Sequence, residues 1–201
     1  MHKKIPLTRG AVALVSAEDY DFLRSMGGWC LSSAGYAVHY GYADDGRRTT
    51  ISQHRLVMAR KLGVSVPTTL VVDHVDRDRL NNTRDNLRTA TRSQNQANRS
   101  TNHNSPTSYK GVTVDGYKFR ARIRFNRGQR LELGNHEDAE TAARLYDAAS
   151  RLLNARYANC NFPDEASSPL ILALLRVYVE RNPAALAYLK QQGRLAQLLD
   201  A

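Results

Sequence analysis

Residues 73–98 read DHVDRDRLNNTRDNLRTATRSQNQAN, and this stretch decides the fold expected around it. The apolar residues 70–72 before it predict a short buried strand. The polar residues 76–85 predict a loop, and residues 86–89 predict a second strand that returns beside the first. Thr91 is a suitable N-cap for a following helix, so the expected order is strand, loop, strand, helix.

The polar residues of this stretch suit phosphodiester hydrolysis, which needs a hard cation and a base that activates water. Asp73, Asn86 and Asn95 offer carboxylate and carboxamide oxygens, which suit Mg²⁺ or Mn²⁺. His74 suits the base at neutral pH, provided that its other ring nitrogen has a partner. The Asn86 carbonyl, on the neighbouring predicted strand, is the candidate for that partner.

The segment from Val71 to Arg99 resembles the HNH endonuclease motif, in the variant whose third position is Asn. The resemblance implies a ββα-metal fold. It also implies that Asp73 and Asn95 are metal ligands for Mg²⁺ or Mn²⁺. In the same way, His74 becomes the catalytic base and Asn86 the residue that orients it.

Other polar residues nearby have simpler interpretations. Asn81, Asn82 and Asp85 are expected to do no more than cap the turn of the loop. His54-Arg55 begins a predicted helix over 53–62 that stops at a glycine. A solvated helix start and a phosphate contact both remain open for this pair.

The composition favours a polyanionic partner. Lys and Arg number 29 against 19 Asp and Glu, which gives a formal net charge of +10. Basic surfaces gain affinity for polyanions by releasing counterions from phosphates, and with the resemblance to HNH endonucleases the expected partner is double-stranded DNA. The two cysteines are far apart, and no apolar run approaches membrane-spanning length. We therefore expect no membrane association and a cytoplasmic protein.

A second pattern lies at Lys118–Phe125, where charged and apolar residues alternate. Residues two apart share one face of a strand, so four cations gather on one face and Phe, Ala, Ile and Phe on the other. Flanking strands are expected at 109–114 and 129–133, and a helix over 137–153 should cover the apolar face. The sequence thus predicts a three-stranded antiparallel sheet packed on one helix. A merely solvated charged face is the alternative interpretation of the cations.

Residues 108–163 resemble the AP2 DNA-binding domain in several separated pieces, including SYKGV at 108–112, KFRA at 118–121 and AARLYD at 142–147. The resemblance implies that the outer face of the sheet enters the DNA major groove. Together with the alternating strand, it gives the expected DNA-binding residues as Lys110, Lys118, Arg120, Arg122, Arg124 and Arg130.

The expected fold class is α+β in five sections: 1–65 an N-terminal α+β section, 66–99 the nuclease motif, 100–107 a linker, 108–163 the AP2-like domain and 164–201 a helical tail. The tail is expected to form two helices broken near Asn182-Pro183. Its apolar stripes must either dock on the chain's own domains or pair with a second copy, as a homodimer.

Two functions follow. The first is a metal-dependent DNA endonuclease of homing type, as in phages and mobile elements, which nicks one strand per active site. The second is a non-catalytic DNA-binding or regulatory protein in which the strand–loop–strand–helix segment is only a scaffold.

Overall fold

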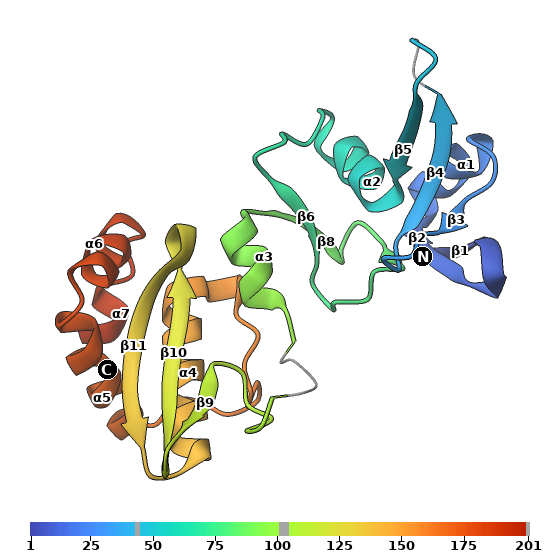
Figure 1. The fold of residues 1–201 in the computed structure, drawn as a ribbon. Helices are drawn as coiled ribbons and strands as arrows, with labels where there is room; N and C mark the ends of the chain where they lie inside the picture. The colour runs from blue at the N-terminus through green and yellow to red at the C-terminus, as the bar shows by residue number, and fades with distance from the viewer. Residues whose placement is uncertain (43–44, 101–104, 200–201) are drawn as a thin grey trace. The chain divides into compact units, whose positions relative to one another are not determined.

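The computed structural model describes residues 1–42, 45–100 and 105–199. It divides into two compact units, Met1–Thr91 and Arg92–Ala201 (Figure 1). Each unit is mixed α and β, in agreement with the expected class. The linker expected at 100–107 lies largely outside the described residues, and the division into five sections stays a prediction.

The first unit begins with a small sheet of order β1-β2-β7. Strand β1 (His2–Pro6) pairs antiparallel with β2 (Val12–Ser16), and the short β7 (Asn81–Asn82) pairs parallel with β2. The 3₁₀ turn η1 (Thr8–Gly10) joins the first two strands. Strand β1 was not predicted from the sequence. Only Ile5 is buried along it, so buried and exposed residues do not alternate.

A second antiparallel sheet has the order β3-β4-β5, with bounds Cys30–Leu31, Ala37–Tyr42 and Arg48–Ser52. Helix α2 (Gln53–Leu62) packs on β4 and β5, whereas helix α1 (Ala17–Ser25) packs on β1 and β2 of the first sheet. Helix α2 ends at Gly63, whose φ of 71° is the left-handed C-cap expected from the sequence. The fully buried Asp19 joins both helices, because its carboxylate accepts from Arg60 and Arg84 at 2.9 and 2.7 Å.

The nuclease segment follows the predicted order of elements. Strands β6 (Val71–His74) and β8 (Leu87–Ala90) form an antiparallel hairpin, and helix α3 (Arg92–Asn98) comes next in the chain. The intervening loop contains β7, which had been expected to be loop only. The division between units falls at the start of α3.

The second unit is built on an antiparallel sheet of order β11-β10-β9. Its strands are β9 (Val112–Asp115), β10 (Lys118–Phe125) and β11 (Gln129–His136), with the turn η2 (Asn126–Gly128) between the last two. The expected alternation of β10 is confirmed: its four cations are exposed, while Ala121, Ile123 and Phe125 are buried. Helix α4 (Ala139–Asn154) covers the apolar face, as expected (Figure 1).

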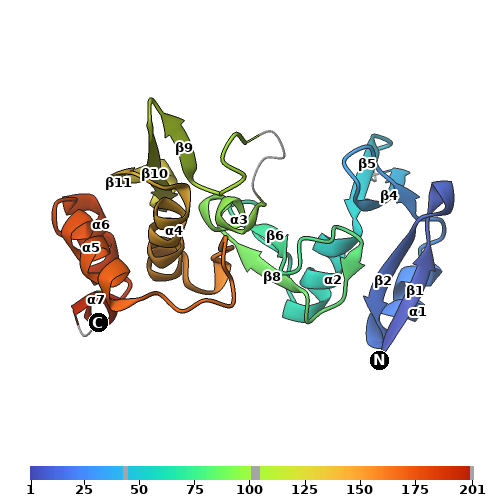
Figure 2. The same ribbon diagram turned by 90° about the horizontal axis from the view of Figure 1, so that it is seen from below.

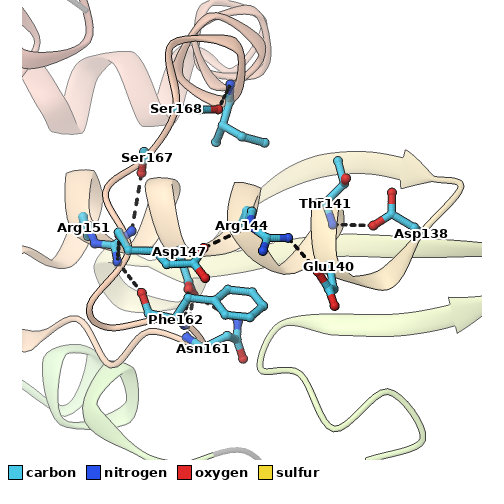
Figure 3. A network of polar contacts seen from close by, with 12 residues as sticks. Asp138, Glu140, Thr141, Arg144, Asp147, Arg151, Asn161, Phe162, Ser167 and Ser168 are labelled. Carbon is cyan, nitrogen blue, oxygen red and sulfur yellow. Dashed lines mark hydrogen bonds and ion pairs between the residues drawn. The ribbon is translucent and has the colours of Figure 1, made fainter.

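Polar contacts tie the chain that follows α4 back onto this helix (Figure 3). After the turn η3 (Ala155–Tyr157), the backbone N–H groups of Asn161 and Phe162 donate to the buried Asp147 carboxylate at 2.8 and 2.7 Å. Burial raises the pKa of Asp147, against the effect of these donors. Arg151 donates to the Phe162 and Glu165 carbonyls, which completes the attachment.

The tail forms helices α5 (Pro169–Glu180), α6 (Pro183–Gln191) and α7 (Ala196–Leu199). The expected break is confirmed, with Asn182 as the N-cap of α6. Leu175 and Val179 of α5 are fully buried in the same core as the sheet and α4, and α5 lies beside α4 (Figure 2). The apolar stripe is therefore used within the chain. None of the helices in the described ranges is long and apolar enough to cross a membrane.

Candidate active site

The β6–β8 hairpin carries Asp73 and His74 at the end of its first strand, and both side chains are buried. Asp73 lies directly opposite Arg88 of β8, and the Arg88 Nε donates to its carboxylate at 2.8 Å. Directly opposite residues of an antiparallel pair share one face, so this ion pair lies on one side of the hairpin. His74, the next residue along the strand, points to the other side.

The His74 ring meets a buried amide on that side. Its Nε2 lies 2.9 Å from the Oδ1 of Asn82, which is on β7 and has no exposed surface. The Asn82 Nδ2 in turn donates at 2.8 Å to the Oε1 of Gln53, a fully buried residue that begins α2. Two elements from separate parts of the first unit, β7 and α2, thus converge on the histidine of β6.

Aromatic rings pack around His74. The ring of His54 lies 5.3 Å from that of His74, and Tyr36 lies 5.0 Å from His54 and 6.0 Å from His74. Burial, together with the charges of His74 and Arg55, lowers the pKa of His54 to about 4. His54 is thus a neutral ring within the site at neutral pH, and neither a solvated helix start nor a phosphate contact describes it.

Arg55 has a structural role. Its guanidinium donates to the Val66 and Leu70 carbonyls at 2.6 and 3.2 Å, which holds the chain that leads into β6.

Asn86 lies elsewhere than the sequence predicted. Its Oδ1 accepts from the Asp76 N–H at 3.0 Å, and its Nδ2 donates to the Asp76 carboxylate and the Asn81 carbonyl at 2.8 and 2.7 Å. The reason is that Asn86 precedes β8 rather than lying in it, so its side chain turns into the loop. The carboxamide on the His74 ring belongs to Asn82 instead, a residue that the sequence analysis assigned to the turn.

The loop that Asn86 closes is held by its own polar groups. Asn81 behaves as expected of a turn residue, since it donates to Asp76 and accepts from the Thr83 hydroxyl. Burial opposes ionisation of Asp76, but the hydrogen bonds from Asn81, the Asp78 N–H and Asn86 outweigh it and lower its pKa. The loop therefore contains an ionised carboxylate close to His74.

Asn95 lies on α3 and is half-buried. It belongs to the second unit, so its meeting with Asp73 around one ion stays a prediction. In the described part of the chain, no group of three or more His, Cys, Asp or Glu side chains is arranged to hold a metal. One carboxylate and one carboxamide fit a hard cation such as Mg²⁺, which takes few protein oxygens and completes its shell with water and phosphate.

Helix α3 is attached to the sheet of the second unit at its C-terminal end. The Lys110 ammonium donates to the Ala97 carbonyl, and Asn159 donates to the Asn98 and Arg99 carbonyls at 3.2 and 3.1 Å. These donors satisfy carbonyls that a helix end leaves unpaired. Lys110, expected to contact DNA, is thus engaged in holding α3.

The other expected DNA-binding residues lie together on the outer face of the sheet. Arg124 is directly opposite Arg130 on β11. Lys118 pairs with Glu137 at 2.7 Å, and Arg120 pairs with Asp115. Within the described ranges, no ion pair engages Arg122, Arg124 or Arg130.

A groove of about 670 Å³ runs between α3 and this face of the sheet. Arg92 and Gln96 of α3 line one side, and Arg122 and Arg124 of β10 line the other. The second unit therefore presents a basic groove directly beside the helix that carries Asn95.

Comparison with known proteins identifies the family of the segment that contains α2 and the β6–β8 hairpin. Residues 53–97 match the family model described as HNH endonuclease, and this range includes Gln53, Asn82 and both members of the Asp73-His74 pair. An uncharacterised HNH endonuclease of Acanthamoeba polyphaga mimivirus is 32% identical over 154 residues, which cover 76% of each chain. No solved structure matches. The chain belongs to the HNH endonuclease family and is a DNA endonuclease.

Proposed function

We propose that the protein is a metal-dependent endonuclease that nicks double-stranded DNA, with His74 as the base that activates water. One observation carries this proposal: His74 is fixed on a family-matched hairpin, with its ring held by a buried carboxamide and with Asp73 next to it in the chain. A histidine suits proton transfer near neutral pH. The attacking water gives its proton to the ring as its oxygen bonds to phosphorus, and the bond from phosphorus to the leaving oxygen breaks.

Asp73 and Asn95 would hold the cation, with Mg²⁺ or Mn²⁺ as the best fit to their oxygen donors. Such an ion, when bound, stabilises negative charge on the phosphate and the leaving oxygen. Arg88 keeps the Asp73 carboxylate oriented through their ion pair. Asn86 serves the site indirectly, because it fixes the loop that follows His74.

Recognition is assigned to the sheet of the second unit, in the manner of an AP2-like domain. Arg122, Arg124 and Arg130 are the strongest candidates, because no ion pair engages them in the described ranges, although Glu132 lies opposite Arg122 on β11. Cations that repel one another on an open face gain from contact with phosphates and guanines. Because α3 is held on the same unit, the distance from recognised bases to Asn95 should be constant. A constant offset suits a site-preferring enzyme of homing type.

One nuclease site per chain favours a single-strand nick. A homodimer through the tail would bring two sites together and allow a double-strand break. The buried stripe of the tail is occupied within the chain, so such pairing would have to use its remaining exposed apolar residues, such as Leu170 and Val177. We therefore propose that the nicking species is a monomer.

The first test is plasmid nicking with and without Mg²⁺, for the wild-type protein and His74→Ala. The base acts in the transition state, so its loss should lower the rate by roughly two to four orders of magnitude and leave DNA affinity unchanged. His39→Ala, on β4 of the same unit, is the matched control and should keep its activity. Unchanged nicking by His74→Ala, or nicking in excess chelator, would contradict the proposal.

The second test separates the two groups of cations on the sheet. Replacing Arg122, Arg124 and Arg130 together with Ala should reduce the slope of log affinity against log salt by about 2.7, if each contacts one phosphate. Replacing the ion-paired Lys118 and Arg120 should change this slope less. Equal affinity and equal slope for the triple variant would exclude this face from DNA binding.

A further inference from the structure

We infer that Asn82 and Gln53 are positioning residues for His74, which fix its ring and decide which of its nitrogens carries the proton. The inference rests on the proposed function, in which His74 is the base. It begins from the chain of hydrogen bonds that joins Gln53 Oε1, the Asn82 amide and His74 Nε2, at 2.8 and 2.9 Å.

The direction of donation follows from the orientation of the Asn82 amide in the structure. The Asn82 NH₂ group faces Gln53 Oε1, so its carbonyl oxygen faces the imidazole. A carbonyl oxygen only accepts, and the imidazole must therefore donate through an N–H at Nε2. In a neutral imidazole the proton sits on one nitrogen, so this hydrogen bond places the proton on Nε2 and the lone pair on Nδ1.

The relay is rigid because each member belongs to the core of the first unit. Asn82 lies on β7, which pairs parallel with the central strand β2, and it is directly beside Val15. Gln53 begins α2, and the next turn of this helix buries Val57 and Met58. Both amides have no exposed surface, so water does not compete for these hydrogen bonds.

The alternative is that the two amides merely satisfy one another in a crowded core. That role would affect stability alone, whereas a positioning role affects the tautomer and the turnover number. An imidazole with its proton on the wrong nitrogen presents an N–H to the attacking water and cannot act as the base. These consequences separate the two roles in experiment.

The test combines imidazole ¹⁵N NMR with kinetics on the full chain. At a pH where the ring is neutral, wild-type His74 should show the proton on Nε2. Asn82→Leu keeps the size of the side chain and removes the acceptor, so it should mix the tautomers and lower kcat roughly 10- to 100-fold with KM unchanged. Asn82→Asp supplies an acceptor again and should restore the Nε2–H form and much of kcat. Trp29 fluorescence checks that each variant is folded, because this tryptophan is buried in the same unit.

A wild-type ring protonated on Nδ1 would overturn the inference without any variant. So would an Asn82→Leu protein that keeps both the wild-type tautomer and the wild-type kcat. An inactive wild-type protein with a clear Nε2–H ring would instead contradict the proposed function, while the hydrogen-bond relay itself would stand. Gln53→Leu is the second variant, and it should loosen the same tautomer preference because the Asn82 NH₂ group loses its acceptor.

Discussion

Replacement of His54 by Phe should make the first unit less sensitive to acid. His54 has a pKa of about 4 in the folded protein against 6.5 for an ordinary histidine, because burial and its charged neighbours disfavour the protonated ring. The unfolded chain therefore binds more protons than the folded protein between about pH 6.5 and pH 4. The free energy of unfolding of the first unit must then fall as the pH drops through this window. Below about pH 4 both states are protonated and this loss is complete.

The magnitude follows from the two pKa values. Lowering the pH from 7 to 4.5 should reduce the free energy of unfolding by about 2 kcal/mol through His54 alone. His54→Phe keeps an aromatic ring against Tyr36 and His74 but does not titrate. It also removes a buried Nδ1 that has no hydrogen-bond partner among the residues that the structure describes, so it should not destabilise the protein at pH 7.

Urea unfolding at several pH values, followed by the fluorescence of the single Trp29, measures the first unit directly. The acid-induced loss should be smaller by about 2 kcal/mol in His54→Phe than in the wild-type protein. His39→Phe, on β4, controls for the loss of a histidine elsewhere in the unit. Asp19 and Asp76 have lowered pKa values, so their effects fall at lower pH. Identical pH dependence in His54→Phe and wild type would refute this reasoning.

Two further outcomes concern the second unit. Gly111→Ala should cost about 2–4 kcal/mol of stability, because Gly111 has φ of 77° and a Cβ there would meet the Tyr146 ring. The control Gly116→Ala has φ of 62° and open space around it, so thermal unfolding should show a loss of only about 1 kcal/mol. Removing the tail to give 1–163 should expose the core and produce aggregates, while light scattering of the full chain gives a monomeric mass. A stable, monomeric 1–163 protein would show that the tail is dispensable.

The elements best predicted from the sequence are those in which buried residues recur at a regular spacing. Lys118–Phe125 alternates without interruption, so the strand, its exposed face and its covering helix were all predictable. Helix α2 was predictable as far as its last residue, because Gly63 supplies the left-handed cap. Strand β1 was not, since a single buried residue leaves no period to detect.

The functional asparagines show where such prediction stops. Asn81 and Asn82 are adjacent and chemically identical, yet one caps the loop and the other holds the His74 ring. Both residues pair with β2, and their side chains point to opposite faces of the sheet, so only Asn82 reaches His74. The pairing of β7 with β2 is a contact between distant parts of the chain that no local pattern encodes. Asn86 was misplaced for the related reason that its position just before β8 turns its side chain into the loop.

The nuclease motif also depends on residues outside it. Few apolar side chains of the motif are buried, chiefly Val72, Leu87, Ala90 and Ala97, too few for an independent core. His74 is fixed through Gln53, which lies upstream on α2, and the end of α3 is fixed by residues of the second unit. A motif held from both sides cannot be exchanged as a free module without losing the geometry of its base or of its helix. Changes in the flanking units should therefore alter cleavage through position, even where no flanking residue touches the reacting phosphate.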